Sequence, residues 1–192
     1  MNAVILVGGK SSRMGTNKAF LELKGKTFIE LQIELLREMF DEISISANTP
    51  SEYEYLNLPI FKDIYPGKGP LGGIYTSLIN SSSLHTFMLA CDMPFVGPKL
   101  IKHLKDLTKE YDVVIPKSEN GLEPLHAFYS KNCIEPIKRE LDENNLRIRS
   151  FFPQVNVKIV ELDSLASSDH FKNSIKNLNT MADYEDVTEN NC

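Results

Sequence analysis

The first eighteen residues constrain the fold more than any other part of the chain. They read MNAVILVGGKSSRMGTNK, in which an apolar run at residues 3–7 ends at the pair Gly8 and Gly9. A loop of small residues follows and carries Arg13 and Lys18. Backbone N–H groups approach an anion closely only where no Cβ intervenes, so a buried strand entering such a loop is typical of phosphate-binding α/β proteins. We therefore predict a first strand at 3–7, with Arg13 and Lys18 neutralising a polyphosphate.

Two familiar phosphate motifs do not fit this loop. A P-loop requires G-x-x-x-x-G-K-[ST], but counting from either glycine of the pair puts Arg13 or Met14 at the second glycine. Gly15, the next glycine, is followed by threonine and not by lysine. The dinucleotide fingerprint G-x-G-x-x-G fails because the first two glycines are adjacent. An alternative interpretation is a plain turn between strand and helix, with its basic side chains on a solvated face.

Length and composition indicate one ordinary domain. The chain has 192 residues and 42% hydrophobic residues, and we expect a single domain over 1–185 with a frayed polar tail at 186–192. Its longest apolar runs fall far short of the roughly 20 residues that span a bilayer. The run at 3–7 is also too short for the apolar part of a secretory signal.

The net charge and the cysteines indicate which partners and which cellular compartment to expect. A net charge of −5 argues against a general nucleic-acid binder, although it leaves room for a locally cationic cleft. Cys91, Cys133 and Cys192 are widely spaced and form no C-x-x-C pair. This pattern favours the reducing cytoplasm, without a disulfide framework or a zinc site. We expect neither a nucleic acid nor a membrane as partner.

Strand candidates alternate with helix candidates, which predicts an α/β fold with a doubly wound, mostly parallel sheet. Strands are expected at 3–7, 42–47, 58–61, 86–90, 113–115, 125–129 and 157–161. Thr27 and Glu30 form a capping box that starts a helix, and Gly97-Pro98 starts another. Further helices are expected near 74–79, after a glycine-proline loop at 66–73, and at about 133–144.

Asp92 directly follows the buried strand at 86–90. Ligands of open α/β sheets bind beyond the carboxyl ends of the strands, which places Asp92 on the same edge as the loop at 8–18. A carboxylate there can hold Mg²⁺, which would bridge triphosphate oxygens. The alternative is that Asp92 only caps a turn before Pro94.

Four segments of the chain resemble one family of enzymes. LVGGKSSRMGTNK resembles the L-A-G-G-x-S-x-R-M-G-x-D-K loop of nucleotidyltransferases, most closely that of the MobA family of molybdenum cofactor guanylyltransferases. PGKGPLGGI at 66–74, LACDMPF at 89–95 and NLNT at 177–180 resemble its G-P-L-x-G-I, C-D-M-P-F and N-x-N-T-P segments, in the same order. Asn17 replaces the acidic residue of the first signature, and Met181 replaces the proline of the last. Neither is an obvious proton donor or metal ligand, so we expect both to tune affinity.

The resemblance implies a Rossmann-like nucleotidyltransferase fold and a set of site residues. The expected catalytic residues are Asp92, Lys18 and Arg13, with Asp92 as the Mg²⁺ ligand. The expected nucleotide-binding residues are Leu6, Val7, Gly8, Gly9, Arg13, Lys18, Asp63, Pro70, Leu71, Gly72 and Asp92. Ser46 or Asn48 could also touch the base or ribose, and Asp63 could instead be a surface turn residue. For the pterin substrate the expected residues are Glu123, Asn177 and Asn179, although asparagine also forms turns readily.

The implied reaction transfers GMP from GTP to the terminal phosphate of molybdopterin, with Mg²⁺ as cofactor and pyrophosphate as by-product. Recipient molybdoenzymes or their chaperones are the implied transient partners. One alternative is a cytidylyltransferase on the same cofactor, a group that carries Ala-Ala-Gly where this chain has Val7-Gly8-Gly9. A sugar-phosphate nucleotidyltransferase and a non-catalytic nucleotide or cofactor carrier are the others. No covalent nucleophile is expected, because Cys91 adjoins a buried strand, and His126 is interpreted as structural in preference to catalytic.

Overall fold

The protein is described by a computed structural model, which covers residues 1–8, 17–23, 25–165, 171, 174–175, 178 and 183–184. Four predicted site residues, Gly9, Arg13, Asn177 and Asn179, lie outside these ranges, as does the expected tail at 186–192.

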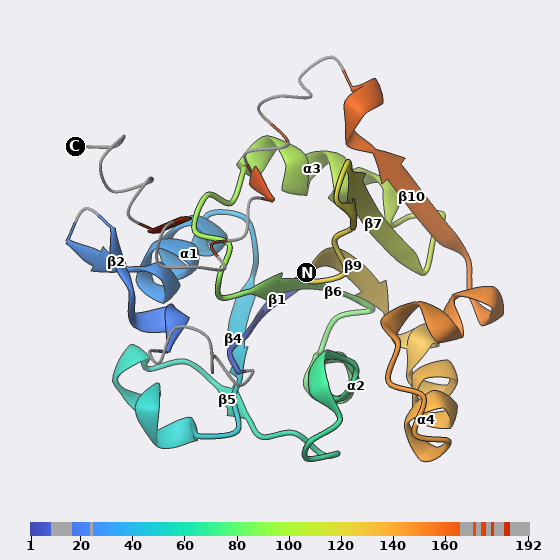
Figure 1. The fold of residues 1–192 in the computed structure, drawn as a ribbon, viewed down its shortest axis with the longest axis horizontal. Coiled ribbons are helices and arrows are strands. Elements are labelled where there is room, and N and C mark those ends of the chain that lie inside the picture. Colours follow the sequence, from blue (N-terminus) through green and yellow to red (C-terminus); the bar gives the residue numbers. More distant parts are fainter. Residues whose placement is uncertain are drawn as a thin grey trace.

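The centre of the fold is an eight-stranded mixed sheet (Figure 1). Its order is β10-β7-β9-β6-β1-β4-β5, and the short β8 pairs with β7. The strands are β1 (Asn2–Leu6), β4 (Glu42–Ser46), β5 (Ile60–Phe61), β6 (His85–Ala90), β7 (Val113–Ser118), β8 (Gly121–Leu122), β9 (His126–Ser130) and β10 (Val157–Glu161). Within the long path, β9 runs antiparallel to both of its neighbours and every other pair is parallel. The predicted mostly parallel, doubly wound α/β sheet is therefore confirmed.

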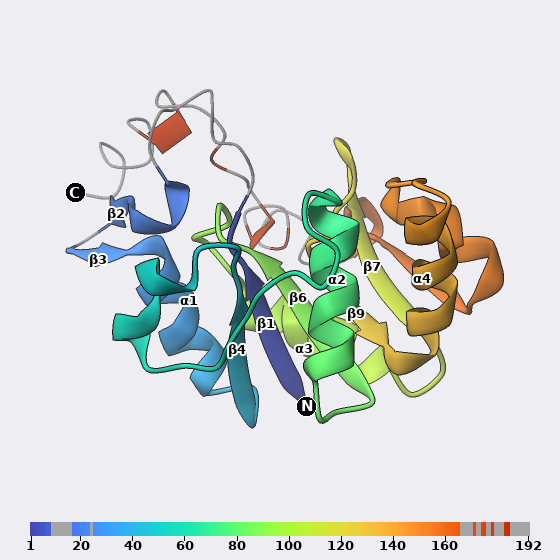
Figure 2. The ribbon, with the colours of Figure 1, turned by 90° about the horizontal axis from the view of Figure 1, so that it is seen from below.

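Helices cover both faces of the sheet. They are α1 (Phe28–Arg37), α2 (Gly69–Asn80), α3 (Pro98–Leu107) and α4 (Ile134–Asp142). Figure 1 shows α1 and α3 on one face and α2 and α4 on the other, and Figure 2 views the second face. β6 illustrates why both faces are apolar: Phe87 and Leu89 enter the core beneath α1 and α3, while Met88 enters the core beneath α2 and α4. Alternate side chains of one strand thus serve two hydrophobic cores.

Short elements connect the main strands and helices. The chain also forms a small hairpin, β2 (Glu22–Leu23) with β3 (Lys26–Thr27), before α1. Single turns of 3₁₀ helix are η1 (Lys18–Phe20), η2 (Pro50–Glu52), η3 (Glu54–Leu56), η4 (Lys131–Cys133) and η6 (Leu162–Ser164), and η5 (Ile148–Gln154) is longer. None of the helices in the described part of the chain is long and apolar enough to cross a membrane.

Helix starts follow the predicted capping chemistry in two cases. Thr27 and Glu30 form the capping box of α1, with the Thr27 N–H donating to Glu30 Oε2 over 2.8 Å. Gly97 is the N-cap of α3, with Pro98 in its first turn. The helix expected at about 133–144 is α4, which begins after the turn η4.

The start of α2 corrects the prediction. A loop was expected through residue 73, but α2 begins at Gly69 and includes Pro70 in its first turn. Proline is tolerated there because the N–H that it lacks has no partner within the helix. Leu71 is fully buried in the core beneath α2, so packing extends the helix through glycines that weaken it in isolation.

The strand register collects chain segments at one edge of the sheet. Leu6 of β1 lies beside Ser46 of β4 and Ala90 of β6, and Ser46 also lies beside Phe61 of β5. Because these strands are parallel, the residues that follow them emerge at a common carboxyl edge. β9 is antiparallel to β6, so the segment before His126 reaches that edge too.

Candidate functional site

A lysine and a carboxylate from distant parts of the chain meet at the carboxyl edge. Lys18 Nζ lies 3.1 Å from Asp92 Oδ2, and the two side chains are 16% and 23% exposed. Lys18 opens η1, and the next residue, Ala19, is fully buried in the core. Asp92 follows β6 after a single residue. Two of the three predicted catalytic residues are thus in contact, and the third, Arg13, lies outside the described residues.

The turn that carries Asp92 is hydrogen-bonded from three sides. From β1, Leu6 O accepts from Cys91 N over 3.2 Å. From α1, Gln32 Nε2 donates to Ala90 O over 2.8 Å and to Met93 O over 2.9 Å. From the C-terminal segment, Leu178 N donates to Asp92 O over 3.0 Å. The backbone on both sides of the carboxylate is therefore fixed by neighbouring elements.

Gln32 was missed by sequence reasoning. It is 1% exposed and lies in the buried stripe of α1 with Ile29, Ile33 and Leu36. A polar residue in an otherwise apolar helix face is a signal that could have found it, because buried amides need hydrogen-bond partners.

A second cluster at the same edge surrounds Asp63. Asn48 Nδ2 donates to Asp63 Oδ2 over 2.8 Å, and Ser46 Oγ donates to Asp63 Oδ1 over 3.5 Å. Helix α2 approaches this cluster at Gly73, where an added Cβ would lie 2.8 Å from Leu6 Cδ2 and 3.9 Å from Asp63 Oδ1. The predicted residues Leu6 and Asp63 are therefore neighbours, with Ser46 and Asn48 beside them.

The glycine-proline segment contributes to this cluster mainly through its backbone. The Leu71 side chain is fully buried in the core, so only its main chain can face a ligand. Gly72 also packs closely, since a Cβ there would lie 3.1 Å from Tyr65 O. Tyr65, just before the segment, donates from Oη to Asp142 Oδ1 at the end of α4 over 3.2 Å, and Lys68 Nζ donates to Asn144 Oδ1 just after α4 over 2.7 Å.

The predicted pterin residues lie toward the other side of Asp92 or outside the described residues. Glu123 Oε1 accepts from Ser118 Oγ over 3.3 Å, at the end of β7, and His126 N donates to Glu123 O over 3.1 Å. Asn177 and Asn179 are not described, but Leu178 between them is fully buried with Leu23 and Phe28. In the sheet order, β6 lies between β9, which Glu123 precedes, and the strands β1, β4 and β5, which lead to the Asp63 cluster. The Asp92 turn, which follows β6, therefore lies between Glu123 and Asp63.

Two titratable groups near this edge have the properties of core residues. His126 is fully buried, its ring meets Phe87 edge-on at 5.2 Å, and neither ring nitrogen has a hydrogen-bond partner among the described residues. Burial lowers the pKa of His126 to about 3, so its imidazole is neutral at physiological pH. Burial also raises the pKa of the Cys91 thiol to about 12, which removes it as a nucleophile.

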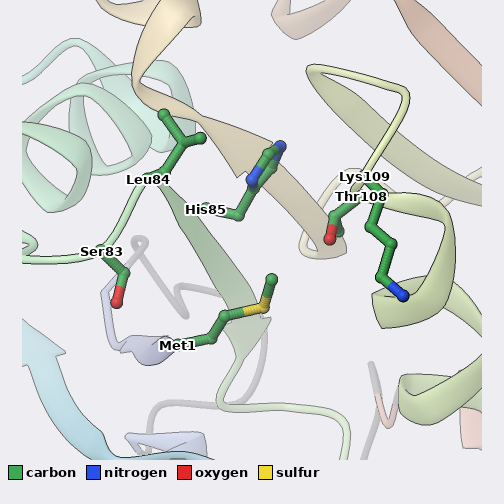
Figure 3. Close-up of a pocket in the computed structure, with 6 residues that line it drawn as sticks. All are labelled: Met1, Ser83, Leu84, His85, Thr108 and Lys109. Carbon is green, nitrogen blue, oxygen red and sulfur yellow. The ribbon is translucent and has the colours of Figure 1, made fainter.

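A separate hollow lies at the opposite edge of the sheet (Figure 3). Its volume is about 360 Å³ and it is lined by Met1, Ser83, Leu84, His85, Thr108 and Lys109. Met1 and His85 stand at the amino ends of β1 and β6, whereas Lys18 and Asp92 lie beyond their carboxyl ends. This hollow is therefore distinct from the Lys18–Asp92 site.

A doubly wound sheet with a lysine and a carboxylate paired beyond the carboxyl ends of its strands has the class of ligand crevice that open α/β proteins use. Residues 3–158 match the family model described as the MobA-like NTP transferase domain. The chain belongs to this family, and it is accordingly a nucleotidyltransferase.

Named relatives cover almost the whole chain. It is 40% identical over 190 residues to a Clostridium perfringens protein named "Probable molybdenum cofactor guanylyltransferase", covering 97% of this chain and 95% of the relative. It is 33% identical over 187 residues to the "Molybdenum cofactor guanylyltransferase" of Desulfosudis oleivorans, covering 96% and 93%.

The fold is shared with a solved relative as well. The crystal structure of "Molybdopterin-guanine dinucleotide biosynthesis protein A" from Archaeoglobus fulgidus superimposes with a TM-score of 0.83 and 27% identity, covering 98% of this chain and 97% of that one. The resemblance drawn from the four sequence segments is thereby confirmed, together with the expected fold class.

Proposed function

We propose that this chain transfers GMP from GTP to the terminal phosphate of molybdopterin, forming molybdopterin guanine dinucleotide and releasing pyrophosphate. The observation that carries the proposal is the 3.1 Å contact between Lys18 and Asp92 beyond the carboxyl ends of β1 and β6. The names of relatives that match nearly the full chain support the choice of substrates.

Little acid–base chemistry is needed for this reaction. The acceptor is a phosphate, which is already a nucleophile, so no strong general base is required. Catalysis then depends on aligning the acceptor with the α-phosphate for in-line attack and on stabilising the charge that develops. Lys18, together with Arg13, would hold the β- and γ-phosphates of the leaving pyrophosphate.

Asp92 fits the role of a protein ligand for Mg²⁺. Mg²⁺ in nucleotide sites usually takes one or two carboxylates and completes its shell with water and substrate phosphates. Asp92 is partly exposed, and its carboxylate lies beside the ammonium that would bind those phosphates. Among the described residues no group of three or more His, Cys, Asp or Glu side chains suits a metal, so the remaining ligands would come from substrate and water. Bound there, Mg²⁺ would supply charge stabilisation at the α-phosphate.

The glycine pair supports guanine over cytosine. Gly8 has φ of +139°, a conformation that L side chains rarely adopt. An alanine at this position, as in the cytidylyltransferase pattern, would be strained on this backbone path. Leu6 and Asp63 lie beside Gly73, and Asp63 is held by Asn48 and Ser46. We assign this cluster to the base and ribose of GTP, and Pro70, Leu71 and Gly72 to the backbone wall of the pocket.

The other substrate would lie on the opposite side of Asp92. Glu123 is at that side of the edge, and Leu178 N, between Asn177 and Asn179 in the sequence, donates to Asp92 O. We assign these three residues to the pterin. The proposal includes handover of the product to molybdoenzymes or their chaperones. It also includes a cytoplasmic location, which is consistent with the unpaired Cys91 and Cys133.

The test is pyrophosphate release with Mg²⁺ and molybdopterin, comparing GTP, CTP, ATP and UTP. Release with GTP alone, dependent on molybdopterin, is the expected result. Preference for CTP would keep the mechanism and overturn the assignment of guanine. Absence of release with any nucleotide, from folded protein with active acceptor, would favour another acceptor or a carrier.

Two variants test the site. Asp92→Ala is expected to abolish turnover with the fold intact, and Lys18→Ala to weaken GTP binding and slow transfer. Lys26→Ala is a matched control, because Lys26 of β3 pairs with Glu34 of α1 over 2.6 Å and both side chains are exposed. A near-normal rate in either site variant would remove the role assigned to that residue.

A further inference from the structure

Asn17, which departs from the first of the family signatures, uses both ends of its side-chain amide. Its Oδ1 accepts from Ala19 N over 3.2 Å and so caps the turn η1, which begins at Lys18. Its Nδ2 donates to Tyr53 Oη over 2.7 Å and to Glu52 Oε2 over 3.0 Å. One side chain thus joins the turn that carries Lys18 to a second segment of the chain.

That second segment is itself firmly packed. Tyr53 joins η2 to η3 between β4 and β5, and only 2% of it is exposed. Its ring stacks on Phe20 with centroids 5.3 Å apart and planes inclined by 19°. Burial raises the pKa of Tyr53 to about 12, so the phenol stays neutral. Asn17 and Phe20 therefore fix η1 against a rigid partner at both of its ends.

A carboxylate at position 17 could not reproduce these contacts. Aspartate would still accept from Ala19 N, and Tyr53 could turn its hydroxyl proton toward it. It has no N–H to donate to Glu52, and the two carboxylates would face each other across a hydrogen-bond distance. An acidic residue at position 17 would thus replace a hydrogen bond to Glu52 by a repulsion between like charges.

We propose that Asn17 and Glu52 are a matched pair that positions Lys18 opposite Asp92. Asn17 is a positioning residue, since its hydrogen bonds act on the turn η1 and reach the substrate only through Lys18. The inference rests on the phosphate role proposed for Lys18. It adds that this role depends on an amide at position 17 because a carboxylate occupies position 52.

The experiment compares Asn17→Asp, Glu52→Gln and the double variant in pyrophosphate release at varied GTP. Asn17→Asp is expected to lower kcat/KM by about ten-fold, which is the effect of about 1.4 kcal/mol. Glu52→Gln alone should stay within about two-fold, because the side-chain oxygen at position 52 still accepts from Asn17. The double variant should recover most of the loss, since the amide nitrogen introduced at position 52 can donate to the carboxylate at position 17.

A matched control exists at the end of α4. Just after α4, Asn145 Nδ2 donates to Glu140 Oε2 over 2.6 Å on an exposed surface. Asn145→Asp introduces the same change of charge beside a glutamate and should leave kcat/KM unchanged. Melting temperatures establish that each variant is folded.

The outcomes separate this inference from the function on which it rests. Adding Asn17→Asp to Lys18→Ala should cause little further loss if Asn17 acts through Lys18. A full additional ten-fold loss, an unaffected Asn17→Asp variant, or a loss that Glu52→Gln fails to rescue would overturn the matched pair. If Lys18→Ala alone has normal kinetics, the phosphate role of Lys18 fails whatever the behaviour of Asn17.

Discussion

Replacing Gln32 by methionine should separate activity from stability. Gln32 donates to Ala90 O and Met93 O, the two carbonyls that bracket Asp92 along the chain. Its own Oε1 is buried and has no hydrogen-bond partner among the residues that the structure describes. Methionine has a similar length and fills the same space without either polar atom.

The stability change is a difference between two opposing effects. Met93 O loses its side-chain donor, which costs about 1–3 kcal/mol for a buried acceptor. Loss of the bond to Ala90 O costs about 0.5–1.5 kcal/mol, because Ala90 O still accepts from Met93 N over 3.4 Å. Removing the unpaired Oε1 returns about 1–3 kcal/mol, the penalty of a buried unsatisfied group. We therefore expect the free energy of unfolding to fall by no more than about 3.5 kcal/mol.

The activity change should be larger than the stability change suggests. The Asp92 turn would lose its attachment to α1 and keep its bonds to Leu6 and Leu178 and the contact of Asp92 with Lys18. A displacement of about 1 Å at a reacting centre can cost about a hundred-fold in rate, so we expect kcat to fall by about ten- to a hundred-fold.

Urea unfolding and pyrophosphate release measure the two quantities. Thr108→Val is the control, because the buried Thr108 donates to Lys105 O over 2.8 Å at the end of α3, away from the site. It should lower stability without changing kcat. A Gln32→Met variant with normal kcat would refute the role of Gln32 in holding the turn.

Two further predictions concern Gly73 and His126. Gly73→Ala should raise the KM for GTP with little effect on kcat, because the new Cβ would lie 2.8 Å from Leu6 Cδ2 and displace that side chain. This holds although alanine stabilises a helix by about 1 kcal/mol relative to glycine. An unchanged KM would show that Leu6 does not border the nucleotide. His126→Leu should leave turnover unchanged and flatten the pH dependence of stability. Burial lowers the pKa of His126 to about 3. The contribution of the buried neutral imidazole to the free energy of unfolding is therefore fully present above pH 6.5. Below pH 6.5 that free energy falls by about 1.4 kcal/mol per pH unit, because the unfolded chain takes up a proton that the folded chain does not. Urea unfolding at pH 7.5, 6.5 and 5.5 measures the free energy of unfolding of the wild-type protein and of His126→Leu. The same change with pH in both proteins would contradict the prediction.

Sequence reasoning predicted the elements whose signal is local. The apolar run before Gly8, the capping box at Thr27 and Glu30, and the Gly97-Pro98 helix start all depend on neighbouring residues, and the structure has each of them. The start of α2 was wrong because its first residues are poor helix formers. Burial of Leu71 decides that boundary, and burial depends on elements far away in the sequence.

The site was predictable as a set of positions but not as a set of contacts. Parallel topology alone is enough to bring Lys18 and Asp92 to one edge, since both follow strands that end there. The hydrogen bonds of Gln32 and Asn17 could not be predicted, because they depend on side-chain directions across 58 and 36 residues of sequence. The preference for an amide at position 17 follows from the negative charge of Glu52, and it becomes visible only when the structure shows the two side chains in contact.

The strand order would also allow Asp92 to serve both of the proposed substrates. β1, β4 and β5 lie on one side of β6 and bring Leu6, Ser46 and the Asp63 cluster to the edge. β9 and β7 lie on its other side and bring Glu123 there, and the reversal of β9 is what turns its preceding segment toward the same edge. Asp92 follows the strand on which the two halves meet. A nucleotide bound on one side and an acceptor phosphate bound on the other would therefore converge on the same carboxylate, which is the arrangement that in-line transfer requires.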